Sequence, residues 1–236
     1  MLSIIIPTLN EEKYLPELLT SIREQSFSDY EIIISDASSE DRTQEVAENF
    51  ACRLVASAKD ARHPSIQRNA GAKIAQGDIL LFLDADTRIE GQDFLEKIIE
   101  EFKARNLAIA GFYLTFNSKK FFYKFFRAFY NFFAFLAQYV KPLALGAGII
   151  VLKKCHEKAG GFDESIYIGE DQAYCEKLKK FGRFRILKSK KIIFSNRRFE
   201  KNGCWKMFRR LMYSTFYVLL FGPIKKKIIE YDFGEW

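Results

Sequence analysis

The first third of the chain alternates short apolar runs with segments of helical periodicity, and this alternation restricts the fold more than any other feature. The runs rich in β-branched and apolar residues are 2–6, 31–35, 53–56 and 78–83. The segments between them, 11–25, 41–50 and 65–76, have the 3.6-residue period of helices. Because the strands are continuous apolar runs, they indicate a parallel sheet covered by helices on both faces. We therefore predict an α/β fold that binds ligands at the carboxyl ends of its strands.

The rest of the chain adds fewer and more varied elements. We expect strands at 108–116, 148–152, 184–187 and 191–194, and helices at 119–140, 170–181 and 205–221. A chain of 236 residues favours one α/β domain with an appendage over two independent folds. The prediction is a domain over 1–200, which includes the aromatic helix 119–140, followed by an amphipathic helix and basic tail over 201–236.

Two carboxylates one residue apart follow the predicted strand 78–83. Asp84 and Asp86 would both reach the ligand-binding edge of the sheet, where unpaired carboxylates are costly unless a cation compensates them. A divalent ion that bridges to a diphosphate meets this need. The alternative is that the pair caps the next helix or pairs with Arg88.

Polar residues also follow the first two strands. Asp36 ends the strand 31–35, where its carboxylate could accept hydrogen bonds from a base or ribose, or could merely cap the chain that follows. The segment 7–12, Pro-Thr-Leu-Asn-Glu-Glu, stands where a dinucleotide-binding fold would have Gly-x-Gly-x-x-Gly, which argues against a nicotinamide or flavin enzyme. The later Gly146-Ala147-Gly148 predicts a turn.

Charge, cysteine content and the amino-terminal sequence restrict the partners and the compartment. The net charge of +7 favours an anionic partner such as a nucleic acid, a phosphate or a membrane surface, and its sign alone does not choose among them. The four cysteines are isolated and there are only two histidines, so we expect no zinc site and a reduced, cytoplasmic compartment. Because the chain opens on an apolar strand pattern without a basic segment, we expect no signal peptide.

Aromatic residues are concentrated in the two helices expected at 119–140 and 205–221. In the first, phenylalanine fills most of the circumference and the polar residues form one narrow stripe: Lys120, Lys124, Arg127, Asn131 and Gln138. The helices could pack on each other and on the sheet, or they could lie on a membrane surface. We favour the membrane, which the basic residues 225–227 would also contact. The uncharged stretches are too short for a spanning helix.

A series of motifs resembles glycosyltransferase family 2. The series is Ile5-Ile6-Pro7-Thr8-Leu9-Asn10-Glu11-Glu12, Ser35-Asp36-Ala37-Ser38, Arg68-Asn69-Ala70-Gly71-Ala72, Asp84-Ala85-Asp86, Gly160-Gly161-Phe162-Asp163-Glu164 and Gly169-Glu170-Asp171. Order and spacing are similar over residues 1–185. The resemblance implies the GT-A fold, a mostly parallel nucleotide-binding sheet flanked by helices, and a nucleotide-diphosphate sugar as donor.

The resemblance also implies roles for individual residues. Pro7, Thr8 and Glu11 would line the nucleoside pocket, and Asp36 would contact the base. Asp84 would approach the ribose, and Asp86, with Asp84 beside it, would bind the Mg²⁺ or Mn²⁺ held by the diphosphate. Asp171 would be the catalytic base, with Glu170 as the other candidate.

The reaction itself needs charges at two places. The diphosphate leaving group must be neutralised, by a divalent ion and by Lys59 and Arg68. An acceptor hydroxyl must lose its proton to a nearby carboxylate, for which the start of the helix at Glu170 and Asp171 is suited. If the acceptor is an anionic phosphate, no base is required and Asp171 would only orient it.

The chain also departs from the family pattern. It lacks the Gln-x-x-Arg-Trp string of members that polymerise sugars, so we expect a single transfer. Arg197 and Arg198 stand in that region and would clamp the diphosphate through their guanidinium groups, or form a solvated basic turn. Members that act on polyprenyl phosphates often add spanning helices, and none is predicted here.

The resulting hypothesis is an inverting, metal-dependent, non-processive glycosyltransferase. It would move a sugar from a UDP- or GDP-sugar to an acceptor that is either a sugar or a lipid-linked molecule, at the cytoplasmic face of an anionic membrane. The acceptor would not be a nucleic acid, and the oligomeric state stays open. One alternative is a nucleotidyltransferase, which would usually have a glycine-rich basic loop where residues 7–12 are acidic. The other is a non-catalytic, membrane-associated protein that binds nucleotide sugars.

Overall fold

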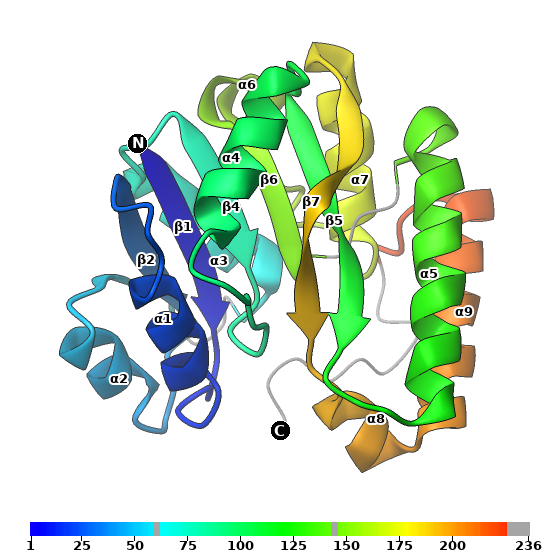
Figure 1. Cartoon of the computed structure of the whole chain (residues 1–236), viewed down its shortest axis with the longest axis horizontal. Helices are drawn as coiled ribbons and strands as arrows, with labels where there is room; N and C mark the ends of the chain where they lie inside the picture. Colours follow the sequence, from blue (N-terminus) through cyan, green and yellow to red (C-terminus); the bar gives the residue numbers. More distant parts are fainter. Residues whose placement is uncertain (59–61, 143–145, 226–236) are drawn as a thin grey trace.

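A seven-stranded sheet forms the centre of the computed structural model, which describes residues 1–58, 62–142 and 146–225. The strand order is β3-β2-β1-β4-β6-β5-β7 (Figure 1). The strands are β1 (Leu2–Thr8), β2 (Tyr30–Asp36), β3 (Arg53–Ala56), β4 (Ile79–Leu83), β5 (Ile109–Phe116), β6 (Gly148–Leu152) and β7 (Phe184–Phe194). All five residues of β4 are buried, so a continuous apolar run does mark a central strand here.

The predicted parallel arrangement is confirmed for the first four strands, and β5 and β7 are also parallel. The exception is β6, which runs antiparallel to both of its neighbours, β4 and β5. The segments 184–187 and 191–194 belong to one strand, because the pairing of β7 with β5 shifts register after Leu187 and resumes at Lys191. The three residues between them form a bulge.

Helices cover both faces of the sheet and make three layers (Figure 1). They are α1 (Leu15–Arg23), α2 (Thr43–Asn49), α3 (Pro64–Ile74), α4 (Phe94–Ala104), α5 (Phe121–Val140), α6 (Lys153–Ala159), α7 (Glu170–Leu178), α8 (Arg197–Asn202) and α9 (Cys204–Phe221). Buried side chains of α1 and α4 pack on one face, and those of α3, α6 and α7 on the other. Of these helices, α4, α6 and α8 were not predicted from the sequence.

Close packing of α3 on the sheet depends on Gly71. A Cβ atom at this position would lie 2.5 Å from Cγ2 of Ile5, closer than carbon atoms approach. The helix that carries Arg68 is therefore seated directly on β1, which fixes where the arginine side chain emerges.

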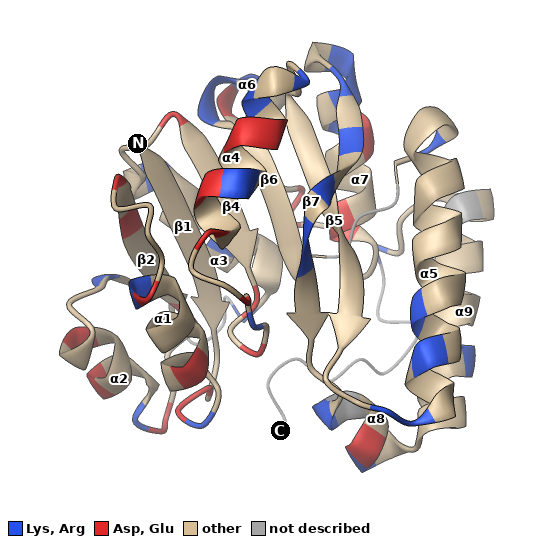
Figure 2. Ribbon diagram, in the orientation of Figure 1, with Lys and Arg blue, Asp and Glu red and all other residues tan. Residues whose placement is uncertain are grey.

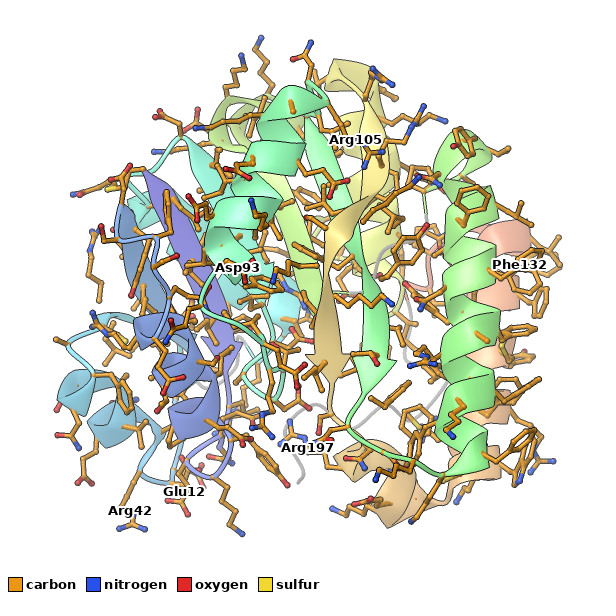
Figure 3. All side chains as sticks on the ribbon, viewed as in Figure 1. Glu12, Arg42, Asp93, Arg105, Phe132 and Arg197 are labelled. Carbon is orange, nitrogen blue, oxygen red and sulfur yellow. The ribbon has the colours of Figure 1, made fainter. Side chains whose placement is uncertain are left out.

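The aromatic helices α5 and α9 pack on each other and on one end of the sheet. Their rings form a cluster with β5, in which Phe208 of α9 contacts Phe122, Phe125 and Phe126 of α5. The same two helices also leave large apolar side chains exposed, such as Phe132, which points away from the sheet in Figure 3. One face of these helices is therefore packed within the protein, as one interpretation predicted, and the other face exposes apolar side chains.

The polar stripe of α5 is divided between solvent and protein, which corrects the expectation of a single polar face. Lys124 and Arg127 are exposed, but Asn131 uses its amide to bond both the N–H and the C=O of Leu114 in β5, at 3.0 Å each. Gln138 is buried and accepts a hydrogen bond from the backbone N–H of Ile186 in β7. Within the described residues, neither α5, α9 nor any other helix has the length and hydropathy of a membrane-spanning segment.

Candidate active site

A cavity of about 240 Å³ lies at the carboxyl ends of β1 and β4. Its walls come from the loops after these strands, from the start of α7 and from α8 and α9. The lining includes most of the predicted site residues: Pro7, Thr8, Glu11, Arg68, Asp84, Asp86, Glu170, Asp171 and Arg197. The topology therefore brings together side chains that are up to 190 positions apart in the sequence, at the edge of the sheet where a parallel α/β fold binds ligands.

Each aspartate after β4 is paired with an arginine from another part of the chain. Oδ1 of Asp84 lies 2.9 Å from Nη2 of Arg68, and Oδ2 of Asp86 lies 2.8 Å from Nε of Arg197. The alternative partner, Arg88, instead pairs with Glu17 at 2.8 Å. The expectation that these carboxylates need cationic compensation is met here by arginines.

Arg68 connects the two acidic regions of the site. Its side chain is almost fully buried, and its second terminal nitrogen, Nη1, donates to Oε1 of Glu170 at 3.1 Å. The guanidinium also lies 5.4 Å from the ring centre of Phe162. Gly146 is adjacent: a Cβ atom there would collide with the guanidinium. One buried cation thus fixes the loop after β4 relative to the start of α7.

Arg197, at the first position of α8, holds the opposite side of the cavity. It donates two hydrogen bonds to the carboxylate of Glu11, at 2.9 and 2.6 Å, and its guanidinium lies 4.5 Å from the ring centre of Tyr14. In Figure 3 it lies near the tips of the strands, beside α8. A solvated basic turn is therefore wrong for Arg197, because its side chain is only 11% exposed. The side chain of Arg198 lies outside the described residues.

Glu170 and Asp171 begin α7, and the structure distinguishes between them. Gly169 precedes them in a left-handed conformation, with φ of +88°, which turns the chain into the helix. Glu170 is ion-paired with Arg68, whereas Asp171 accepts hydrogen bonds from the backbone N–H groups of Gly146 and Gln172, at 2.8 and 2.7 Å. Burial, and secondly the charge of Glu170, raise the pKa of Asp171 to about 7.

Asp36 is at the end of β2 as predicted, but its carboxylate is directed into the protein. The residue is fully buried, and its oxygens accept hydrogen bonds from the hydroxyl of Thr8, from Ser39 and from the amide of Gln44. In this structure Asp36 therefore orders the loop after β2 and fixes Thr8 beside the cavity. Lys59 lies outside the described residues.

Sequence reasoning missed three parts of the site. His63 lines the cavity and caps α3, since its Nδ1 accepts from the N–H of Ser65, and burial lowers its pKa. The sequence His63-Pro64, with proline at the first helical position, was an available signal. Gly146 was predicted only as part of a turn, and the inner face of α9 was not connected with the site at all.

The carboxylates fit a divalent cation that arrives together with a diphosphate. Five carboxylates and three guanidinium groups line the cavity in the described part of the chain. Among all the described residues, no group of three or more His, Cys, Asp or Glu side chains is arranged so that it could hold a metal ion by itself. Mg²⁺ is typically held by one or two carboxylates, with water and substrate phosphates as the other ligands. Asp84 and Asp86 provide this kind of partial ligand set.

Comparison with protein families adds a decisive observation. The model of the glycosyl transferase family 2 domain matches residues 3–154, well over half of the chain. The chain belongs to glycosyl transferase family 2. The matched region includes every predicted site residue up to Asp86, and the family assignment agrees with the resemblance seen in the motifs.

An individual relative is also named a glycosyltransferase. The 4,4'-diaponeurosporenoate glycosyltransferase of Staphylococcus haemolyticus is 37% identical over 106 residues, which are 43% of this chain and 28% of that protein. The chain thus spans well under half of this relative's length.

Two solved structures have the same fold. The structure of Staphylococcus aureus TarS 1–349 in complex with UDP has a TM-score of 0.66 at 21% identity, covering 83% of this chain and 61% of that chain. The mannosyltransferase PcManGT from Pyrobaculum calidifontis, in complex with GDP-Man and Mn²⁺, has a TM-score of 0.65 at 21% identity, covering 79% and 54%. These similarities confirm the predicted GT-A type α/β fold.

Proposed function

We propose that this protein transfers a single sugar from a nucleotide-diphosphate sugar to an acceptor hydroxyl, with inversion at the anomeric carbon. One observation carries the proposal: a single cavity joins the Asp84–Asp86 loop to Asp171, whose pKa is raised to about 7. The first group suits a diphosphate with its cation, and the second suits a general base at neutral pH. Because the Asp84–Asp86 loop and Asp171 are far apart in the sequence, chance is a weak explanation for their meeting in one cavity.

The donor half of the site has residues for each part of a nucleotide diphosphate. Pro7, Thr8 and Glu11, at the end of β1, would line the nucleoside pocket. Asp86 and Asp84 would hold Mg²⁺ or Mn²⁺, which neutralises charge on the leaving diphosphate when it is bound. Arg197 now bonds Glu11 and Asp86, and its guanidinium could instead bond phosphate oxygens bidentately. UDP- and GDP-sugars are the donors to test first, because solved relatives of the same fold bind UDP and GDP-Man.

In the acceptor half, Asp171 would take the proton. The acceptor oxygen forms a bond to the anomeric carbon, its proton moves to Asp171, and the bond to the diphosphate breaks with its electron pair leaving on the nucleoside diphosphate. One such displacement inverts the configuration of the sugar. Glu170 is less suited to be the base because Arg68 holds it as an ion pair.

Replacement of Asp86 tests the donor half. We expect the Asp86→Ala variant to lose the metal-dependent part of donor affinity, at least about tenfold, because that carboxylate is a proposed ligand of the cation. Calorimetric titration of UDP- and GDP-sugars with and without Mn²⁺ measures it. Asp93→Ala, at a half-exposed aspartate paired with Lys190, is the control. Equal metal dependence in Asp86→Ala and the wild type would refute the assignment.

We also propose that the protein binds anionic membranes peripherally, at the cytoplasmic face, through the outer surface of α5 and α9. The support is a set of large apolar side chains with exposed fractions of 40–81%: Phe121, Phe125, Phe132, Phe133, Phe135, Leu136, Tyr139 and Val140 on α5, and Trp205, Tyr213, Phe216, Leu220 and Phe221 on α9. Basic residues lie on and just before α5, at Lys120, Lys124 and Arg127 (Figure 2). Each would contribute about 1 kcal/mol beside an anionic surface.

Vesicle co-sedimentation tests this attachment. The wild type should bind phosphatidylserine-containing vesicles, with binding weakened by salt because surface charge is screened. The double variant Phe121→Glu/Phe132→Glu should detach. Thr20→Glu/Gln76→Glu adds the same charge at exposed positions on α1 and after α3, and should bind normally. Equal binding by both double variants, or none by the wild type at low salt, would refute the proposal.

A further inference from the structure

The cavity continues beyond the catalytic carboxylates along one face of α9. The α9 residues that line it are spaced as a single helical stripe: Met207, Leu211, Ser214, Thr215 and Val218. Phe194 and Phe199 line the cavity as well, from the end of β7 and from α8. We call the part of the cavity bordered by these seven residues the apolar arm. None of the seven residues carries a charge, so these side chains cannot offset the charge of a diphosphate.

The apolar arm is physically attached to the catalytic residues. Val218 packs against Gly169, the residue before Glu170, so closely that a Cβ atom on Gly169 would lie 2.9 Å from Cγ2 of Val218. Just after α9, Ile224 pairs with Ile168 in an antiparallel bridge, with N–H to O=C distances of 3.0 and 3.1 Å. The arm therefore ends where α7 presents its two carboxylates.

The chemistry of the apolar arm selects against a carbohydrate. A sugar presents several hydroxyl groups, and each one buried without a partner loses its hydrogen bonds to water. The arm offers the hydroxyls of Ser214 and Thr215, and Ser214 already donates to the carbonyl of Leu211 at 3.0 Å. The remaining lining of the arm is aliphatic, thioether or aromatic, which favours an alkyl chain.

The outer face of α9 supplies a route for such a chain. Trp205, Tyr213, Phe216 and Leu220 are more than half or about half exposed on this face, while the inner stripe borders the cavity. The same helix is thus apolar toward the site and apolar toward the surroundings. A chain held in a membrane against the outer face would need to pass only one helix to reach Asp171.

We propose that the apolar arm is the acceptor subsite and that its occupant is the alkyl chain of an amphiphilic alcohol whose hydroxyl meets Asp171. The inference rests on the proposed function and adds the acceptor class. In the transfer, the alcohol oxygen bonds to the anomeric carbon, its proton moves to Asp171, and the nucleoside diphosphate leaves with the electron pair. The product is an alkyl glycoside.

Straight-chain alcohols from 1-butanol to 1-decanol are the probes. With the nucleoside diphosphate bound, we expect affinity to rise about fourfold per added carbon, the ratio equivalent to about 0.8 kcal/mol per buried CH₂. Calorimetry measures the binding, and mass spectrometry of the alkyl glycoside measures the transfer. Donor binding by the same samples is titrated separately. A protein that binds no donor refutes the proposed function. A protein that binds the donor, but whose affinity for alcohols does not depend on chain length, refutes the acceptor class.

Two variants locate the binding. Leu211→Gln makes the arm polar and Thr215→Phe fills it, so each should lower decanol affinity at least about 30-fold while donor affinity stays as in the wild type. Phe181→Gln, after α7 and outside the cavity lining with 42% of its surface exposed, is the control and should bind decanol normally. If Leu211→Gln and Thr215→Phe retain donor binding and bind decanol like Phe181→Gln, the arm is not the acceptor subsite.

Discussion

Replacing Asp171 by asparagine should separate chemistry from binding at this site. The amide keeps the shape of the side chain and can still accept one of the two hydrogen bonds from Gly146 and Gln172, which reach different oxygens of the carboxylate. It cannot take a proton from an acceptor. We expect donor affinity to be retained and turnover to fall by about two to four orders of magnitude, the usual contribution of general-base catalysis.

The pKa of Asp171 also predicts how strongly the turnover of the wild type depends on pH. With a pKa of about 7, roughly half of the Asp171 carboxyls are ionised at neutral pH and about a tenth at pH 6. Turnover should therefore rise about tenfold per unit below pH 7 and level off above pH 8. Glu170→Gln removes a charge that raises the pKa of Asp171, so the rising limb should move to lower pH.

The raised pKa of Asp171 also makes the free energy of unfolding depend on pH. Between the ordinary carboxyl pKa near 4 and the value near 7, folded Asp171 holds a proton that the unfolded chain has released. The contribution of this group to the free energy of unfolding therefore decreases as pH rises through that window, and is lost above it. At pH 8 Asp171→Asn buries no charge but leaves one backbone N–H without its acceptor oxygen, so the free energy of unfolding of this variant at pH 8 is the control for folding.

The assay is the release of nucleoside diphosphate from a donor that calorimetry shows to bind, with water or an alcohol as acceptor, across pH 5 to 9. Denaturant unfolding at pH 5 and pH 8 accompanies it. The reasoning is wrong if Asp171→Asn keeps wild-type turnover with the same rising limb. If Glu170→Gln instead abolishes both turnover and the limb, Glu170 is the base.

Two further predictions concern the arrangement of the site. Arg197→Ala removes the cation that the carboxylates of Glu11 and Asp86 share, so the free energy of unfolding in urea should fall by about 3–5 kcal/mol. Mn²⁺ alone should restore part of this free energy, because it binds the folded state. An unchanged free energy of unfolding, or no effect of Mn²⁺, would contradict the assignment. Gly148→Ala should lower the free energy of unfolding by about 1–3 kcal/mol, because its Cβ would collide with Ile192 and contact Phe112 in the sheet; thermal unfolding equal to that of the wild type would show that the sheet can yield there.

Much of the fold was predictable because its strands are continuous apolar runs. The strands at 53–56 and 148–152 were predicted with the boundaries that the structure shows, and the others to within two residues at most at each end, except that β7 was predicted as two pieces. Direction was less predictable: the sequence of β6 looks like that of a parallel strand, yet β6 is antiparallel to β4 and β5. Apolar content reports burial on both faces, and it does not report the orientation of a strand.

The sequence alone determined which residues end the strands and begin the helix at Glu170, because apolar periodicity and turn residues are local signals. These signals identified Asp84 and Asp86 as candidates, and the resemblance to glycosyltransferase family 2 added Asp171. Only the tertiary structure decided their partners: Arg68 for Asp84, Arg197 for Asp86 and the N–H of Gly146 for Asp171. It also turned Asp36 inward and placed one face of α9 on the cavity. These outcomes depend on the packing of distant segments, and the charge a buried group tolerates is set by whichever neighbours that packing supplies.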